Sequence, residues 1–402
     1  MAEPSKPIGL TAAILIGATC FALGAVAFYL WDSSRFFAEE TPIAEPVIEP
    51  AVVEPARDQD YAVQRIFFGT DRNLERETEI GPVFGHERAG ELTLGYRDVT
   101  IPSDAHAIGE IELPNSFTVF TVTLWEEAED PARHFTVYET QVLDRDTFVA
   151  MASEAAVAAE TYPASAFVFI HGFNTTFRAA MFRAAQLTYD LGFDGPAFAY
   201  SWPSVGATAD YVTDLDSADN AALHMDEFFD TVFGIPGVEK VHVLAHSMGN
   251  AALAEFLTRA GTKISRRDGK PIDQLVLAAP DLDASQFPSI AKHFTDVAKG
   301  VTLYAASTDM ALFASKSLRK NHVRLGDIGP NGPVIVPGMD SIDVSAVGTE
   351  ILSLNHNIYA RNRGVLDDLG RLFQTGERPP TKRMPTLREV ARGTEKYWQM
   401  PE

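Results

Sequence analysis

The sequence predicts a doubly wound α/β domain, with helices on both faces of a mostly parallel sheet. Short apolar runs alternate with helix-like stretches in the second half of the chain. The runs are continuous and do not alternate with polar residues, as expected for strands buried on both faces. Strands that alternate with helices indicate βαβ units and a parallel sheet. The predicted strands are 166–170, 196–202, 241–245, 274–279 and 301–306, and two of the predicted helices are 177–192 and 219–234.

A β-rich segment, residues 61–160, precedes this pattern and predicts an N-terminal extension packed on the α/β domain. It is rich in β-branched and aromatic residues and is interrupted by Gly, Pro, Asn and Asp, which is typical of strands and turns. The last part of the extension, residues 144–160, is Ala-rich and predicts a helix. Asp144 or Asp146 is available as its N-terminal cap. The expected strands are 62–70, 91–101, 108–114, 117–126 and 134–143.

The complete domain is expected to span 61–376. Residues 377–402 contain several prolines and are relatively basic. They are expected to form a C-terminal tail on the surface of the domain.

Residues 1–31 predict an N-terminal membrane anchor with one transmembrane helix over 8–31. Residues 7–31 carry no charge, and a bilayer-spanning helix needs roughly 20 apolar residues. Lys6 precedes it and acidic residues follow it, so the positive-inside rule places the bulk of the chain on the extracytoplasmic side. A cleaved signal peptide, with Ala25-Val26-Ala27 at the cleavage site, is the alternative.

Residues 32–60 predict a disordered linker between the anchor and the domain. Repeated Glu-Pro pairs give this stretch no amphipathic period. Proline removes backbone donors, and the negative charges repel one another. We therefore expect a semi-stiff spacer that holds the domain away from the membrane.

The charge and the cysteine content exclude several classes of function. The formal net charge is −22, which argues against nucleic acid as a partner, because phosphate binding requires basic patches. Cys20 is the only cysteine and lies in the predicted anchor. The domain therefore has neither a disulfide nor a thiol nucleophile.

The stretch VHVLAHSMGNAAL, residues 241–253, predicts a serine nucleophile on a tight turn between a strand and a helix. Ser247 follows an apolar run and precedes a helix-like run, which is the context of a G-x-S-x-G turn. Ala245 replaces the first glycine of that pattern, and alanine is the next smallest residue. The backbone N–H of Met248 is then expected to donate to an oxyanion.

Other strand ends carry the remaining candidates, because ligands of doubly wound sheets bind at the carboxyl ends of the strands. His171-Gly172 follows 166–170, and the backbone N–H of Phe173 is the expected second oxyanion donor. Trp202 ends the next predicted strand, 196–202. Trp202 and His171 are the candidate substrate-binding residues, with packing as the alternative role of Trp202.

The predicted acid and base come later in the chain. Asp309 follows the second strand after Ser247, and Asp281 follows the first. Asp309 is the favoured acid and Asp281 the alternative. His356 is the expected base, because it lies in a late loop after both acids, as the chain order Ser, Asp, His requires. No metal or other cofactor is expected, since the His and acidic residues lack the helical spacing of metal ligands.

Several stretches over about 62–360 make the sequence resemble the α/β-hydrolase superfamily. More narrowly, it resembles a bacterial family of α/β hydrolases formerly described only as a domain of unknown function, which is similar to serine esterases and lipases. The matching stretches are FFGTDRN (67–73), GYRDVTIP (95–102), FVFIHGFNTTF (167–177), AYSWPS (199–204), VLAHSMGN (243–250), VLAAPDLDASQF (276–287), LYAASTDMAL (303–312) and NHNIY (355–359).

The resemblance implies the α/β-hydrolase fold, with Ser247, Asp309 and His356 as the catalytic triad and Phe173 and Met248 as the oxyanion donors. Its Asp71-Arg72 pair has no derivable role beyond a structural salt link. The expected function is a carboxylic ester hydrolase that acts on a small-molecule or lipid ester at the periplasmic side of the inner membrane. The alternatives are an amidase, thioesterase or acyltransferase with the same triad, and a non-catalytic, membrane-tethered binding or scaffolding module.

Overall fold

The computed structural model describes residues 60–119, 122–205, 211–264, 271–307, 323–347 and 363–401. The predicted membrane helix at 8–31 and nearly all of the predicted linker lie outside these residues. Within the described part of the chain, no helix combines the length and the apolar character needed to span a bilayer.

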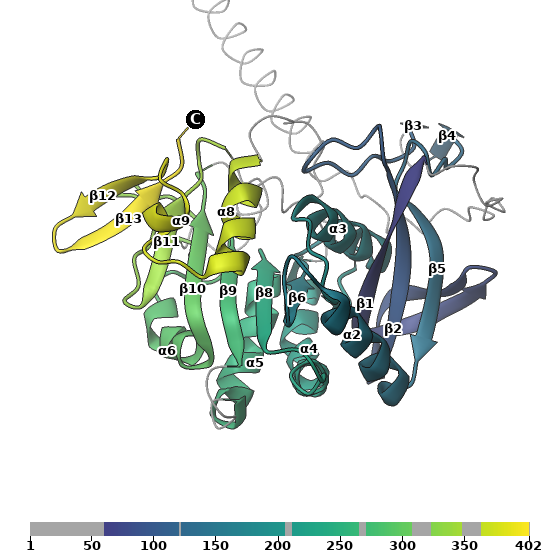
Figure 1. The fold of residues 1–402 in the computed structure, drawn as a ribbon, viewed down its shortest axis with the longest axis horizontal. Coiled ribbons are helices and arrows are strands. Elements are labelled where there is room, and N and C mark those ends of the chain that lie inside the picture. Colours follow the sequence, from purple (N-terminus) through teal and green to yellow (C-terminus); the bar gives the residue numbers. More distant parts are fainter. Residues whose placement is uncertain are drawn as a thin grey trace, which may run out of the picture.

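One sheet organises the fold and confirms the predicted mostly parallel architecture (Figure 1). Its described strands follow the spatial order β12-β13-β11-β10-β9-β8-β6-β7-β1-β2-β5. All neighbours from β1 to β13 across the centre pair in parallel, whereas β1–β2, β2–β5 and β12–β13 are antiparallel. The strands are β1 (Tyr61–Thr78), β2 (Gly81–Pro102), β5 (Thr136–Leu143), β6 (Ser165–Ile170), β7 (Ala197–Ser201), β8 (Lys240–His246), β9 (Ile272–Ala278), β10 (Ala298–Ala305), β11 (Met339–Asp343), β12 (Arg388–Arg392) and β13 (Glu395–Gln399).

Helices cover both faces of the sheet, as the continuous apolar runs predict. On one face, α2, α4, α5 and α6 pack against residues such as Val168 and Val243. On the other face, α3 and α8 pack against their chain neighbours Phe167 and Leu244. The described helices are α2 (Arg145–Ala158), α3 (Phe177–Asp190), α4 (Tyr211–Val232), α5 (Gly249–Ile264), α6 (Phe287–Val297), α8 (Arg363–Thr375) and α9 (Pro380–Arg383).

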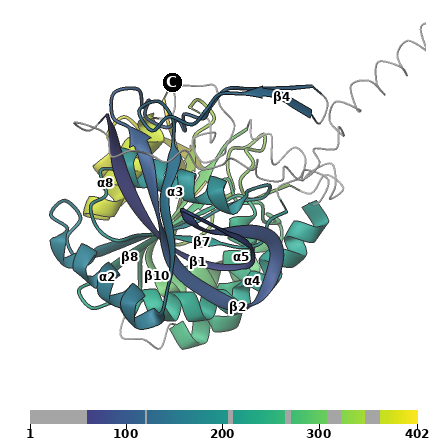
Figure 2. The same ribbon diagram turned by 90° about the vertical axis from the view of Figure 1, so that its right-hand side faces the viewer.

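Three strands of the N-terminal extension, β1, β2 and β5, belong to the main sheet. β1 pairs in parallel with β7 and in antiparallel with β2, and Figure 2 shows β1 and β2 as a long bent pair at one end of the sheet. Residues 117–126, predicted as one strand, instead contribute to a separate hairpin of β3 (Ser116–Val119) and β4 (Val122–Glu126).

The strand predicted at 108–114 is absent from the described structure, where these residues form turns and loop. The carboxylate of Glu112 accepts a hydrogen bond from the backbone N–H of Ala107 at 2.8 Å and contacts the His106 ring at 2.9 Å. The segment therefore folds back on its own side chains, and its apolar residue Ile111 is buried without pairing in a sheet.

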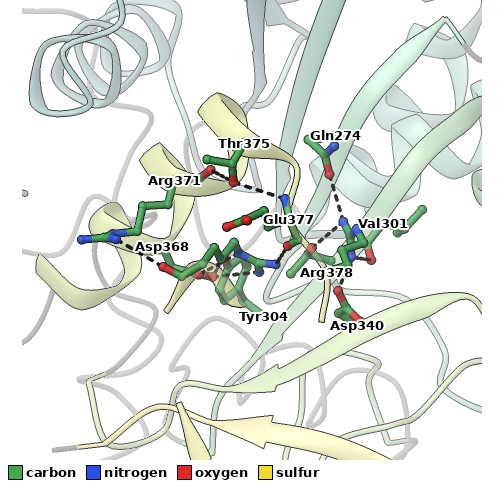
Figure 3. Close-up of polar contacts among 11 residues, drawn as sticks. Gln274, Val301, Tyr304, Asp340, Asp368, Arg371, Thr375, Glu377 and Arg378 are labelled. Carbon is green, nitrogen blue, oxygen red and sulfur yellow. Dashed lines mark hydrogen bonds and ion pairs between the residues drawn. The ribbon is translucent and has the colours of Figure 1, made fainter. Parts of the chain in front are cut away.

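The C-terminal residues, expected to lie on the surface as a tail, extend the sheet by β12 and β13. Two arginines hold this segment in place, and Figure 3 shows the contacts of one of them, Arg378, with Gln274 and Asp340. Arg383 pairs with the fully buried carboxylate of Asp368 at 2.8 Å, and Arg378 pairs with Asp340. The arginines of this segment thus pair with one buried and one partly buried carboxylate, and a buried carboxylate is stable only when it is paired.

Candidate active site

Ser247 lies in a tight turn at the end of β8, a central strand between β6 and β9. Its φ is 48°, in the left-handed region that side chains other than glycine rarely adopt. Its N–H donates to the carbonyl of Ala278 at 3.0 Å, and its own carbonyl accepts from the N–H of Asp281 at 3.2 Å. Helix α5 begins at Gly249. The sheet and the helix therefore hold Ser247 in a strained strand-to-helix conformation.

Two glycines allow the backbone to pass close to Ser247. A Cβ at Gly172 would lie 2.9 Å from the Cβ of Ser247, and a Cβ at Gly249 would lie 2.4 Å from the carbonyl oxygen of His171. Both separations are too short for real side-chain carbons. Residues 171–175, which we call the His-Gly loop, therefore pack directly against the serine turn.

The two predicted oxyanion donors belong to these two segments. Met248 directly follows Ser247, and Phe173 lies in the His-Gly loop. Neither backbone N–H donates a hydrogen bond to any residue that the structure describes. The packing of Gly172 on Ser247 brings the two segments together, which is the arrangement that an oxyanion hole requires.

His171 and Trp202, the candidate substrate-binding residues, pack against each other. The indole N–H of Trp202 donates to the carbonyl of His171 at 2.8 Å, and the two rings stack with centroids 5.0 Å apart. Both side chains are buried. Burial, with a smaller effect of the nearby Arg72, lowers the pKa of His171 to about 3, so the ring is neutral at physiological pH. Substrate contact by either residue stays a prediction.

The alternative acid, Asp281, lies close to Ser247 through its backbone but has other partners for its carboxylate. One oxygen pairs with Arg324 at 3.0 Å, and the other accepts from the hydroxyl of Tyr211. The ring of Tyr211 also packs edge-on against Phe173, with centroids 5.4 Å apart. This buried contact joins the loop after β9 to the start of α4 and to the His-Gly loop.

The favoured acid Asp309 and the base His356 lie outside the described residues. Asp309 follows β10, which ends at Ala305, and His356 follows β11, which ends at Asp343. Both strands belong to the parallel part of the sheet that contains β8, so their carboxyl ends share the edge that carries Ser247. The roles of Asp309 and His356 stay predictions.

A cleft of about 420 Å³ adjoins the serine turn between α4, α5 and α6. It reaches the turn at Asp281, whose N–H is bonded to Ser247. Its volume falls within the range of ligand pockets, about 300–1,000 Å³. The apolar part of its wall consists of Leu215, Ala251, Leu282, Phe287 and Ile290, and the polar part of Asp216, Asp219, Asp281, Asp283, Gln286 and Arg324.

Sequence reasoning missed Asp214, which lies within the segment 205–223 expected to form part of the substrate pocket or a lid. Its carboxylate is buried in α4, accepts from the hydroxyl of Ser204 and accepts from the N–H of Val205 at 2.8 Å. It also accepts from the N–H of Asn174 in the His-Gly loop at 3.4 Å. Burial raises the pKa of Asp214. No sequence signal separates this carboxylate from the exposed aspartates around it.

No set of three or more His, Cys, Asp and Glu side chains that could hold a metal ion occurs among the described residues.

The fold and the strained serine turn together define an α/β hydrolase. The model of a protein family described as "Alpha/beta hydrolase of unknown function (DUF900)" matches residues 154–372, more than half of the chain. The chain therefore belongs to that family, and the resemblance found in its motifs is confirmed. No curated protein matches the sequence. Among solved structures, the chain is similar to phospholipase PlaB from Legionella pneumophila, with 10% identity, a TM-score of 0.29 and coverage of 58% of this chain and 68% of that one.

Proposed function

We propose that this α/β hydrolase is a serine hydrolase that cleaves carboxylic esters through an acyl-enzyme. The observation that carries the proposal is the left-handed φ of Ser247 at the end of β8, directly before α5. Such strain persists only where the surrounding structure over-determines it, and it is concentrated at catalytic sites. A serine in this conformation presents its hydroxyl above the edge of the sheet.

The mechanism uses three side chains and two backbone groups. His356 takes the proton of the Ser247 hydroxyl as its oxygen attacks the ester carbonyl, and Asp309 orients the imidazole and stabilises its charged form. The N–H groups of Phe173 and Met248 hold the oxyanion. Collapse of the tetrahedral intermediate transfers the proton from His356 to the leaving alcohol. Water then attacks the acyl-enzyme by the same steps and releases the carboxylic acid.

The cleft beside the serine turn is the proposed binding site for the organic part of the ester. Its apolar wall suits an acyl chain or a lipid tail, because each buried methylene contributes about 0.8 kcal/mol. Its lining carries several carboxylates and a single guanidinium, from Arg324. The lining therefore favours an uncharged ester over an anionic one. No cofactor enters this mechanism.

We also infer that the helix predicted at 8–31 anchors the chain in the inner membrane, with the hydrolase domain in the periplasm. The support is the uncharged sequence of that segment and the charges on either side of it. Protease treatment of spheroplasts containing the full-length chain tests this inference. The domain is expected to be digested without lysis, and protection of the domain would contradict the inference.

Turnover of p-nitrophenyl esters of increasing chain length by the full-length chain tests the proposed function. Wild type is expected to hydrolyse them, and Ser247→Ala is expected to lose nearly all of kcat while it keeps its fold. Loss of three or more orders of magnitude is usual when a triad nucleophile is removed. A folded wild type without turnover, or a Ser247→Ala variant with full activity, would overturn the proposal. Parallel assays with p-nitroanilide and thioester substrates separate an esterase from an amidase or thioesterase.

A further inference from the structure

Arg72 is a buried arginine that approaches the serine turn from the N-terminal extension, outside the residues matched by the family model. It follows the stretch of β1 that pairs with β7, which ends at Thr70. The β1–β2 register shifts on both sides of Arg72, between Thr70 and Arg72 and between Arg72 and Leu74. Such irregularities re-aim side chains and are common beside active sites. Its neighbour Asp71 takes a different direction and accepts from the Tyr200 hydroxyl at 3.0 Å.

The guanidinium of Arg72 joins the His-Gly loop to the loop after β7. One terminal nitrogen donates to the carbonyl of Thr175 at 2.6 Å, and the other donates to the carbonyl of Ser204 at 3.1 Å. Its Nε donates to the hydroxyl of Ser201 at 2.9 Å. Arg72 itself is 1% exposed. A planar fork of donors at fixed angles can satisfy these acceptors together, which a lysine ammonium cannot reproduce.

A second set of bonds ties the same two loops to each other. The N–H of Thr175 donates to the hydroxyl of Ser204 at 3.1 Å, and that hydroxyl donates to the buried carboxylate of Asp214. Asn174, between Phe173 and Thr175, has a φ of 54°. The loop keeps this unfavourable backbone conformation next to the expected oxyanion donor because Thr175 is bonded to Arg72 and Ser204, and the N–H of Asn174 donates to Asp214.

We propose that Arg72 is a positioning residue that fixes the His-Gly loop so that the N–H of Phe173 points at the oxyanion. This inference rests on the proposed function. Arg72 touches no reacting atom in this account. It acts through the carbonyl of Thr175, two residues beyond the donor. Loss of the fork leaves buried carbonyl groups without their donor, so the loop moves and the alignment of the Phe173 N–H is lost.

The test compares Arg72→Lys and Arg72→Gln with wild type in the full-length chain, using a p-nitrophenyl ester. Arg65→Gln is the matched control, because Arg65 lies on the same strand, is partly exposed and pairs with Asp98 away from the His-Gly loop. We expect both Arg72 variants to lose about 10- to 100-fold in kcat, with KM changed less than about threefold, as is typical of a weakened oxyanion hole. Arg65→Gln is expected to keep both constants.

Circular dichroism and thermal unfolding identify the folded fraction, so that kcat refers to folded protein. Folded Arg72 variants with the kcat of wild type would overturn the inference while leaving the proposed function intact. An inactive wild type would instead overturn the proposed function. If both Arg72 variants fail to fold, Ser201→Ala is the milder test, because it removes the hydroxyl that accepts from Nε of Arg72. A several-fold lower kcat supports the inference, and an unchanged kcat contradicts it.

Discussion

The α-carbon of Gly172 passes so close to Ser247 that a Cβ at Gly172 would lie 2.9 Å from the Cβ of the serine. This contact brings the His-Gly loop against the strand-to-helix turn. It places the segment of Phe173 and the segment of Met248 side by side, and the proposed oxyanion hole depends on it.

Gly172→Ala is therefore expected to separate the two segments. The added methyl group has no room, because the nearest atoms belong to the serine turn itself, and overpacking of this kind costs about 1–3 kcal/mol. We expect kcat to fall by about tenfold or more as the oxyanion geometry is lost. Steady-state kinetics and chemical denaturation measure the two effects. Gly90→Ala is the control, because a Cβ there meets no atom within 4 Å, and it is expected to behave as wild type.

The strained backbone at Ser247 is expected to lower the stability of the fold. Ser247→Gly removes the penalty of a left-handed φ, whereas Ser247→Ala keeps it. Both variants are expected to be inactive, and the glycine variant should be more stable than the alanine variant by about 1 kcal/mol. Urea unfolding of the two variants measures this difference. Equal or reversed stabilities would mean that the turn is not strained.

Asp281 and Asp309 are separable by mutation, because the carboxylate of Asp281 already has structural partners. Asp309→Asn is expected to reduce kcat by about three to four orders of magnitude with little effect on stability, as for a triad acid. Asp281→Asn is expected to leave Arg324 buried beside a neutral group and to cost about 3 kcal/mol of stability. Kinetics and unfolding of both variants decide the assignment. A collapse of kcat in stable Asp281→Asn, with an active Asp309→Asn, would reverse it.

His106 is expected to make the stability of the fold decrease at alkaline pH. Burial alone would lower its pKa, but hydrogen bonds to Asp190 and Glu112 outweigh burial and raise the pKa to about 9. Because the folded pKa lies above the unfolded value, the charged ring stabilises the fold fully below pH 6.5, and this contribution disappears as the pH rises through 9. We expect a loss of about 1–3 kcal/mol over this range.

The comparison of His106→Gln with wild type isolates this contribution. Unfolding free energies of both proteins at pH 6, 8 and 10 are expected to differ most at pH 6 and to converge at pH 10. A constant difference across this range would show that the charge of His106 does not stabilise the fold.

The central strands were predictable because their burial on both faces leaves continuous apolar runs. The strands predicted at 166–170 and 241–245 are β6 and β8 within one residue at each end. The start of α4 was harder to place. The predicted helix begins at 219, whereas α4 begins at Tyr211, because the intervening aspartates resemble a loop in sequence.

Features that depend on contacts between distant residues left no local signal. β12 and β13 are partly exposed, so they lack the apolar runs of central strands, and the anchors Arg378 and Arg383 meet their acids only in the folded chain. The same holds at the site. The serine turn was readable from its small residues and its position between a strand and a helix. The contacts of Arg72 with the carbonyls of Thr175 and Ser204 follow from a register shift in β1, and the spacing of residues in the sequence does not predict that shift.

Peptide mapping by mass spectrometry after treatment with a fluorophosphonate identifies the activated serine directly. The full-length chain contains many serines, and we expect one covalent adduct, on the peptide that carries Ser247, with no adduct in Ser247→Ala. Prior incubation with an ester substrate should slow its formation. Folded protein that remains unmodified, or that is modified at another serine while Ser247 stays free, would contradict the claim that this turn holds an activated nucleophile.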